Sequence, residues 1–92
     1  MNVDVYYTTQ LRAAHGRSQQ RVTIDSGATL GQLLRQLAQA HPAVFATHVF
    51  DAQGQVLPGV MLCVGDEHVT EPDSHVLQED ATVTILSAIS GG

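Results

Sequence analysis

The pattern of hydrophobic and polar residues predicts a pair of β-strands at the start of the chain. Val3, Val5 and Tyr7 occupy alternate positions, which is the period of a strand with one buried face. A second strand with the same period is expected at Arg21–Ile24. The segment Thr9–His15 would then connect the two, so that they form a hairpin with a long loop.

One main helix follows, with a defined start and end. Thr29 is a suitable N-cap, and Gln32 three residues later completes a capping box. Pro42 ends the helix, because proline disfavours helical backbone in the residue before it. The apolar stretch Pro42–Phe50 is short, and its pattern fits either a helical turn or an irregular segment. Four leucines at helical spacing give the helix one apolar face: Leu30, Leu33, Leu34 and Leu37.

The second half of the chain predicts further strands. Met61–Val64 is continuously apolar, as a buried strand is, and a turn leads from it into a short arm at Glu67–Thr70. Thr82–Leu86 is the last predicted strand, with Val83 and Ile85 facing the same way. The order is therefore strand, strand, helix, strands, strand.

This order predicts an α+β fold, with a mixed sheet of four to five strands and one main helix packed across it. It is the arrangement of the β-grasp fold, although the pattern alone leaves several other α+β arrangements open. Residues 1–86 are expected to form this single domain, and residues 87–92 a flexible C-terminal tail that ends in Gly-Gly.

Composition and charge indicate which kinds of partner the chain is suited to bind. The chain has 92 residues, which is the size of one domain, and 43% of them are apolar. Its net charge is −5; all four arginines lie in the first 40 residues, the chain has no lysine, and seven of the nine acidic residues lie beyond residue 50. This balance argues against binding to nucleic acid or to an anionic membrane. The acidic half is expected either to meet a basic protein partner or to form solvated loops.

The chain is also expected to be cytoplasmic. Its longest apolar run, Val60–Val64, is far shorter than a membrane span, and its first residues lack the basic and apolar regions of a signal peptide. Cys63 is the one cysteine, so no internal disulfide can form. Because Cys63 lies in an apolar strand, it is expected to be a core residue.

No catalytic or metal-binding constellation is apparent in the sequence. The histidines have neither the spacing of a zinc site nor cysteine partners, and they are expected to lie at the surface or to cap helices. His41, in the last turn of the predicted helix, would interact favourably with the helix dipole when protonated. We therefore expect no catalytic residue, no metal and no bound cofactor. The histidines are His15, His41, His48, His68 and His75.

Candidate chemistry is concentrated in the last residues. The final strand runs directly into a tail that ends with Gly91 and Gly92. A tail without β-carbons can enter a narrow channel and bring its carboxylate to the active site of another protein. Because a carboxylate is a poor electrophile, the implied chemistry is activation by ATP, followed by attack of a thiolate or persulfide on the acyl-adenylate. No catalytic side chain of this chain is needed for these steps.

Several segments resemble the MoaD/ThiS family of sulfur carriers. The tail Val83–Gly92 resembles that family's apolar strand followed by Pro-x-x-x-Gly-Gly, although Ser87 stands where proline is usual. Gln10–Gly16 resembles its Leu-Arg-x-x-x-Gly segment, Ala28–Leu34 the start of its helix, and Leu57–Val60 the approach to its third strand. The resemblance covers the whole chain in the same order, but only the Gly-Gly end is specific for function.

The resemblance implies a role for the tail and for one residue beside it. Gly92 would be adenylated and bear the sulfur as a thiocarboxylate, and Gly91 would allow close approach of the backbone. Ser90 and Ile89 would complete the tail. Leu86, facing away from Val83 and Ile85, would contact a partner.

The resemblance also implies the partners. These would be a ThiF/MoeB-like adenylating enzyme that uses ATP, a persulfide-bearing sulfur donor, and a sulfur-accepting enzyme such as the large subunit of molybdopterin synthase. The chain would thus be a carrier and a small subunit, not an enzyme, and molybdopterin synthesis would be its pathway.

Other roles are open at this point. Asn2-Val3, Leu11-Arg12 and Thr84–Leu86 also resemble the sulfur carriers of cysteine biosynthesis, and thiamine-pathway carriers form a third possibility. A role of another class is that of a ubiquitin-like modifier conjugated through Gly92. Lacking lysine, such a modifier could not build isopeptide chains on itself except through its N-terminus. The last alternative is a β-grasp interaction module whose Gly-Gly end is incidental.

Overall fold

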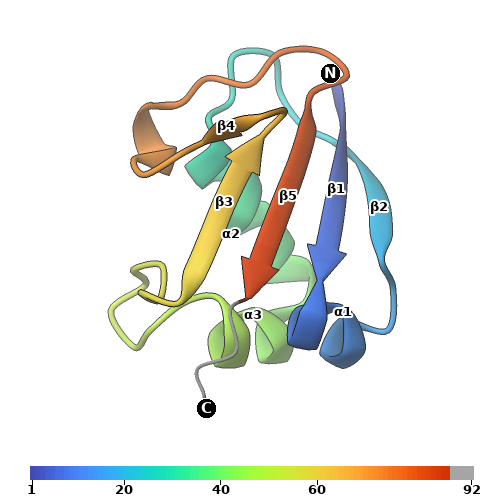
Figure 1. Ribbon diagram of the computed structural model, residues 1–92. Helices are drawn as coiled ribbons and strands as arrows, with labels where there is room; N and C mark the ends of the chain where they lie inside the picture. Colours follow the sequence, from blue (N-terminus) through green and yellow to red (C-terminus); the bar gives the residue numbers. More distant parts are fainter. Residues whose placement is uncertain (88–92) are drawn as a thin grey trace.

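The computed structural model describes residues 1–87 and shows a mixed sheet of five strands in the order β2-β1-β5-β3-β4. The main helix, α2, crosses behind this sheet (Figure 1). This arrangement confirms the predicted α+β, β-grasp architecture. The elements are β1 (Asn2–Thr8), α1 (Thr9–His15), β2 (Gln19–Thr23), α2 (Leu30–Ala40), α3 (Pro42–His48), β3 (Val60–Val64), β4 (Glu67–His68), the 3-10 turn η1 (Pro72–Ser74) and β5 (Thr82–Ser87).

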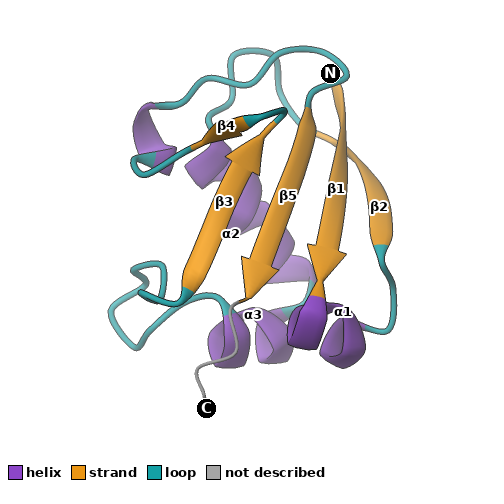
Figure 2. Cartoon of the chain, in the orientation of Figure 1, coloured by secondary structure: helices purple, strands orange, loops and turns teal. Residues whose placement is uncertain are grey.

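The first and last strands form the centre of the sheet. β1 pairs with β5 in parallel and with β2 antiparallel, while β3 pairs antiparallel with both β5 and β4. β5 therefore has a neighbour on each side and leads to the end of the sheet where β1 also finishes (Figure 2). The C-terminal segment thus follows a strand held on both edges.

The main helix has the predicted signals. The Thr29 hydroxyl accepts a hydrogen bond from the Gln32 backbone N–H at 3.2 Å, and the Gln32 side chain accepts one from the Thr29 N–H at 2.8 Å. The helix ends at Ala40, with His41 as its C-cap and Pro42 after it. All four leucines of the predicted apolar face are buried: Leu30, Leu33, Leu34 and Leu37.

Two segments for which the sequence pattern did not establish a helix are helical. Thr9–His15, predicted as a connecting loop, forms α1, and most of Pro42–Phe50 forms α3. Each is only seven residues long, and each buries a residue completely, Leu11 in α1 and Phe45 in α3. Their stability thus depends on packing against the domain, since an isolated helix of this length is unstable in water.

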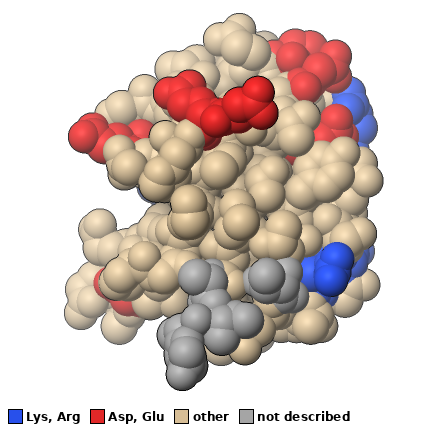
Figure 3. Space-filling model, viewed as in Figure 1, with Lys and Arg blue, Asp and Glu red and all other residues tan. Residues whose placement is uncertain are grey.

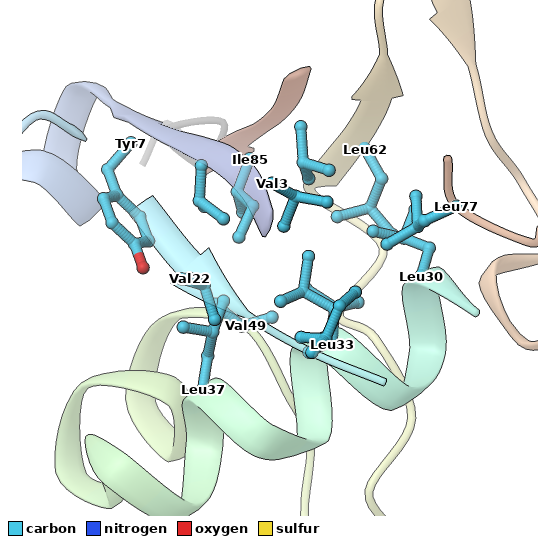
Figure 4. Packing of buried hydrophobic residues seen from close by; sticks show 14 of the residues in the cluster. Val3, Tyr7, Val22, Leu30, Leu33, Leu37, Val49, Leu62, Leu77 and Ile85 are labelled. Carbon is cyan, nitrogen blue, oxygen red and sulfur yellow. The ribbon is translucent and has the colours of Figure 1, made fainter. Parts of the chain in front are cut away.

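The core lies between α2 and one face of the sheet (Figure 4). The strands contribute their inward residues, including Val3, Val5, Val83 and Ile85, none of which has any exposed surface. Within the described residues, no helix has the length and apolar character needed to cross a membrane.

The strand predicted at Met61–Val64 is confirmed as β3, but the prediction that it is buried, with Cys63 in the core, was wrong. Only Leu62 of this strand is buried; Met61 is exposed, and Cys63 is half-buried outside the core cluster. Because neighbouring strand residues point to opposite faces, Met61 and Cys63 lie on the face that no helix covers. A run of apolar residues concealed this alternation.

Candidate functional site

The sheet face opposite α2 is the first part of the candidate site. We call it the open face and define it by the outward residues Tyr6, Met61, Cys63, Thr84 and Leu86. The strand register places Met61 opposite Leu86, and Thr84 between Cys63 and Tyr6. Tyr6 and Met61 expose 36% and 44% of their surface. These two large side chains are therefore accessible to a binding partner.

Leu86 has the orientation that the sequence predicts. It is half-buried and alternates with Ile85 and Ser87, which are buried on the other face. It lies one residue before the last described residue, so it connects the open face to the C-terminal tail. Met61 and Tyr6 were not identified from the sequence; the signal for Met61 was its position next to Leu62, because one of two adjacent strand residues must face outward.

Charge is distributed unevenly around the open face. Figure 3 views this face directly and shows a centre without charged side chains, while acidic residues gather at the edge where β5 begins. Along the chain beyond β3, acidic residues occur in the turn at Asp66, in β4 at Glu67 and in the following loop at Glu71. An apolar centre with an acidic rim on one side suits a protein partner with an apolar patch beside basic residues.

The predicted tail residues lie outside the described residues. These are Gly92, Gly91, Ser90 and Ile89, for which the roles of sulfur bearer and channel-threading tail remain predictions. The structure does describe the base of the tail. β5 extends to Ser87, one residue beyond the predicted strand, where it pairs with Val60 and is only 5% exposed.

The start of α1 is tied to the end of β5. The Thr8 hydroxyl donates a hydrogen bond to the Ile85 carbonyl at 3.3 Å, and Thr8 is the strand partner of Leu86. α1 therefore begins beside the base of the tail. The Gly16 C-cap ends the helix in the left-handed conformation, with φ of 80°, which favours glycine.

A cluster of three rings joins α1 to the rest of the core. The ring of His15 makes edge contacts with Tyr7 and with His41, each at a centroid distance of 4.4 Å. The Tyr7 hydroxyl donates to the Gln20 side chain at 2.8 Å. Two of the five histidines thus lie together although 26 positions separate them, and no local sequence pattern could have indicated this.

Electrostatics in this cluster favour neutral side chains. Burial lowers the pKa of His15 below its ordinary value; His41 and Arg17 lower it further, whereas hydrogen bonding to Gln20 opposes the change. Its Nε2 atom is buried and has no hydrogen-bond partner. Burial likewise raises the pKa of Tyr7 to about 12, against an opposing effect of Arg17. A proton on His15 would therefore place a cation next to a histidine and an arginine.

The described residues offer little machinery for catalysis or metal binding. In residues 1–87, no group of three or more His, Cys, Asp or Glu side chains is placed to hold a metal ion. Cys63 pairs across the hairpin with His68, which is exposed. What the described residues provide is an open sheet face with exposed apolar side chains and a strand, β5, that ends beside it at Ser87.

Comparisons with known proteins agree with this geometry. A sequence model described as the ThiS family matches residues 5–92. The molybdopterin synthase sulfur carrier subunit of Chlamydomonas reinhardtii is 27% identical over 92 residues, which cover 100% of both chains.

Solved structures share the fold. The crystal structure of SAMP1 from Haloferax volcanii superposes with a TM-score of 0.88 at 22% identity, covering 100% of both chains. A chain in the Amycolatopsis orientalis BexX/CysO complex superposes with a TM-score of 0.71 at 25% identity, covering 98% of this chain and 99% of that one.

Proposed function

The chain belongs to the ThiS family of ubiquitin-like sulfur carriers, and on this premise we propose that Gly92 carries sulfur as a thiocarboxylate for molybdopterin synthesis. One observation supports this more than any other: the family match runs through the Gly91-Gly92 pair to residue 92. The proposed pathway is supported by the likeness to the Chlamydomonas carrier subunit over the full length of both chains.

The proposed chemistry takes place on partner enzymes. The Gly92 carboxylate attacks the α-phosphorus of ATP, so that pyrophosphate leaves and an acyl-adenylate forms. The terminal sulfur of a protein persulfide then attacks the acyl carbon and displaces AMP, giving an acyl disulfide. A second thiol then attacks the sulfur of the donor's cysteine in this acyl disulfide. The attack releases the Gly92 thiocarboxylate and leaves the donor's cysteine in a new disulfide with the second thiol. ATP and the persulfide are thus substrates of the partners.

This chain contributes recognition and delivery to these steps. Leu86 and Met61 form an apolar pair at the end of the open face nearest the tail. A partner that covers this pair would hold the tail base at a fixed distance from its own active site. A rigid β5, paired on both edges, would limit the freedom of the docked tail.

Intact-mass spectrometry tests the carrier role. The purified chain is incubated with a ThiF/MoeB-like enzyme, ATP and a persulfide donor, and we expect one oxygen atom to be replaced by one sulfur atom. Fragmentation must place the change on Gly92, because oxidation of Met1, Met61 or Cys63 adds nearly the same mass. A variant lacking Gly92 is the control. An unmodified chain beside an enzyme that activates its own cognate carrier would overturn the proposal.

A transfer assay tests the pathway. The thiocarboxylate form is mixed with the large subunit of molybdopterin synthase and its precursor substrate, and we expect sulfur to leave the carrier. Cysteine-type carriers are the second candidate, because segments of the sequence, among them Leu11-Arg12 and Thr84–Leu86, also resemble them. Transfer only to a cysteine- or thiamine-forming enzyme would replace the proposed pathway, and amide adducts on other proteins would indicate a modifier.

A further inference from the structure

Two adjoining hollows lie beside the main helix, away from the open face. The polar hollow, of about 470 Å³, lies between α2, residues 54–56 and residues 70–74. The apolar hollow, of about 390 Å³, lies between α2, α3 and residues 50–54. Arg35 and Phe50 line both, so the two hollows are continuous. Figure 3 shows the polar hollow as a notch between the part of the molecule that carries β4 and the loop before β3.

The acidic wall of the polar hollow depends on a glycine. Gly31 lies in the first turn of α2, and a β-carbon at this position would overlap the Asp73 carboxylate of η1. Glycine inside a helix is less favourable than alanine, so its presence fits the close approach that it allows. This approach lets Asp73 accept a hydrogen bond from the Arg35 guanidinium at 3.0 Å. η1 is thus held against α2, and the wall of the hollow keeps its position.

The charges of the polar hollow are unbalanced. Asp73 offsets the charge of Arg35, whereas Glu71, an exposed residue just before η1, has no ion pair among the described residues. No lysine or arginine follows Arg35 anywhere in the sequence. The side chain that complements this hollow is therefore a cation from another molecule.

The apolar hollow presents mainly carbon atoms. Phe50 is half-buried and lies against Phe45, with ring centroids 6.4 Å apart, so its ring has a fixed place in the lining. Ala38, Pro42 and Ala46 line the hollow with small apolar side chains. An aliphatic side chain of another molecule would gain by leaving water for this hollow.

We propose that the two hollows together bind a segment of a partner protein in which an apolar side chain lies close to an arginine or lysine. The apolar side chain enters the apolar hollow, and the cation pairs with Glu71 in the polar hollow. These hollows share no residue with the open face, so one protein on the open face and another in the hollows can bind the chain together. The inference does not rest on the carrier role, because its tests need no activating enzyme.

Amide NMR of the whole chain tests the binding, with acetyl-Leu-Arg-amide as the probe. We expect saturable shifts of the Gly54 and Ser74 amide signals, with a dissociation constant on the order of 1 mM. Acetyl-Leu-Glu-amide should bind about tenfold more weakly, because Glu71 repels its carboxylate. Equal binding of the two peptides would overturn the proposal. So would shifts confined to the open face, or the absence of shifts with about 10 mM of the arginine peptide.

The charge is tested by a matched pair of acidic positions. Glu71→Gln removes the unpaired carboxylate, and we expect the affinity for acetyl-Leu-Arg-amide to fall about fivefold. Glu67→Gln is the control, because Glu67 is also exposed but lines neither hollow. An unchanged affinity of the Glu71→Gln variant, or an equal loss in the control, would contradict the proposed ion pair.

The apolar hollow is tested by two alanines of α3. Ala46→Gln places a polar side chain in this hollow, and we expect the affinity for the same peptide to fall about fivefold. Ala43→Gln is the control, since Ala43 is exposed on the same helix and lines neither hollow. Both alanines are exposed, and amide spectra check that the variants fold. Equal affinities of the two variants would show that the apolar hollow does not take part.

Discussion

The two faces of the sheet are built from the same strands but meet different demands. On the covered face, Val83 and Ile85 have no exposed surface and pack beneath α2. On the open face, Met61 is 44% exposed and Leu86 is half-buried, although both are apolar. An apolar side chain that stays in water adds little to folding. The comparison shows that the inward residues of a strand can contribute to stability while the outward residues of the same strand remain available for binding.

The largest expected difference between the two faces is in the free energy of unfolding, and substitutions at two adjacent positions of β5 test it. Ile85→Ala leaves a cavity in the core, and we expect it to lower the free energy of unfolding by about 2–5 kcal/mol. Leu86→Ala removes a similar volume from the open face, where we expect a loss below about 1 kcal/mol. Urea denaturation followed by circular dichroism measures both. Equal losses would show that the open face also stabilises the fold.

For the affinity of a partner, in contrast to stability, we expect the open face to matter more than the covered face. Met61→Asp places a charge in the apolar centre of the open face, and we expect it to weaken binding to the activating enzyme by about 1–3 kcal/mol. Thr82→Asp is the control, since Thr82 is an exposed residue near the acidic edge of the sheet. Isothermal titration calorimetry gives the affinities. A Met61 variant that binds as tightly as the parent chain would place the partner elsewhere.

The covered side has one position that should respond to pH. The pKa of His15 is lower in the folded chain than in the unfolded chain, so the unfolded state binds more protons. The stability associated with neutral His15 is therefore present above the unfolded pKa of about 6.5 and is lost as pH falls through the folded pKa.

Substitution of the histidine tests this sign. We expect His15→Gln to flatten the decline in thermal midpoint as pH falls below about 6.5. His68→Gln, at an exposed position outside the ring cluster, serves as the control. Thermal unfolding followed by circular dichroism across this range is the measurement. A parent chain whose midpoint rises on acidification would contradict the assignment.

The smallest effect is expected for an exposed ion pair on the helix side. Arg35 and Asp73 lie 3.0 Å apart, but their side chains are 59% and 71% exposed. We expect Arg35→Ala to change the free energy of unfolding by less than about 0.5 kcal/mol, because water and salt screen such pairs. Denaturation at low and high salt would reveal a larger role as a salt-dependent difference.

The parts of the fold that local chemistry determines were predictable. The capping box at Thr29 and Gln32 located α2, and alternating residues located β1 and β5. α1 was missed, and α3 was left undecided between a helical turn and an irregular segment, because long-range packing through Leu11 and Phe45 stabilises these helices more than their own sequence does.

The candidate site was predictable only in part. Leu86 was assigned to the outward face because β5 alternates, whereas Met61 was hidden in a run of apolar residues. The contact between His15 and His41 depends on how α1 packs against the end of α2, which no spacing along the chain encodes. Resemblance, not periodicity, is the basis of the role proposed for Gly92.

The parallel pairing of β1 with β5 also has a mechanical consequence. β1 starts at one end of the sheet and β5 finishes at the other (Figure 1). A force that stretches the chain between Asn2 and Ser87 would slide these two strands past each other, so that their hydrogen bonds are loaded together. A hairpin pulled at its open end fails one bond at a time instead. The domain should therefore resist traction along its tail better than its size suggests.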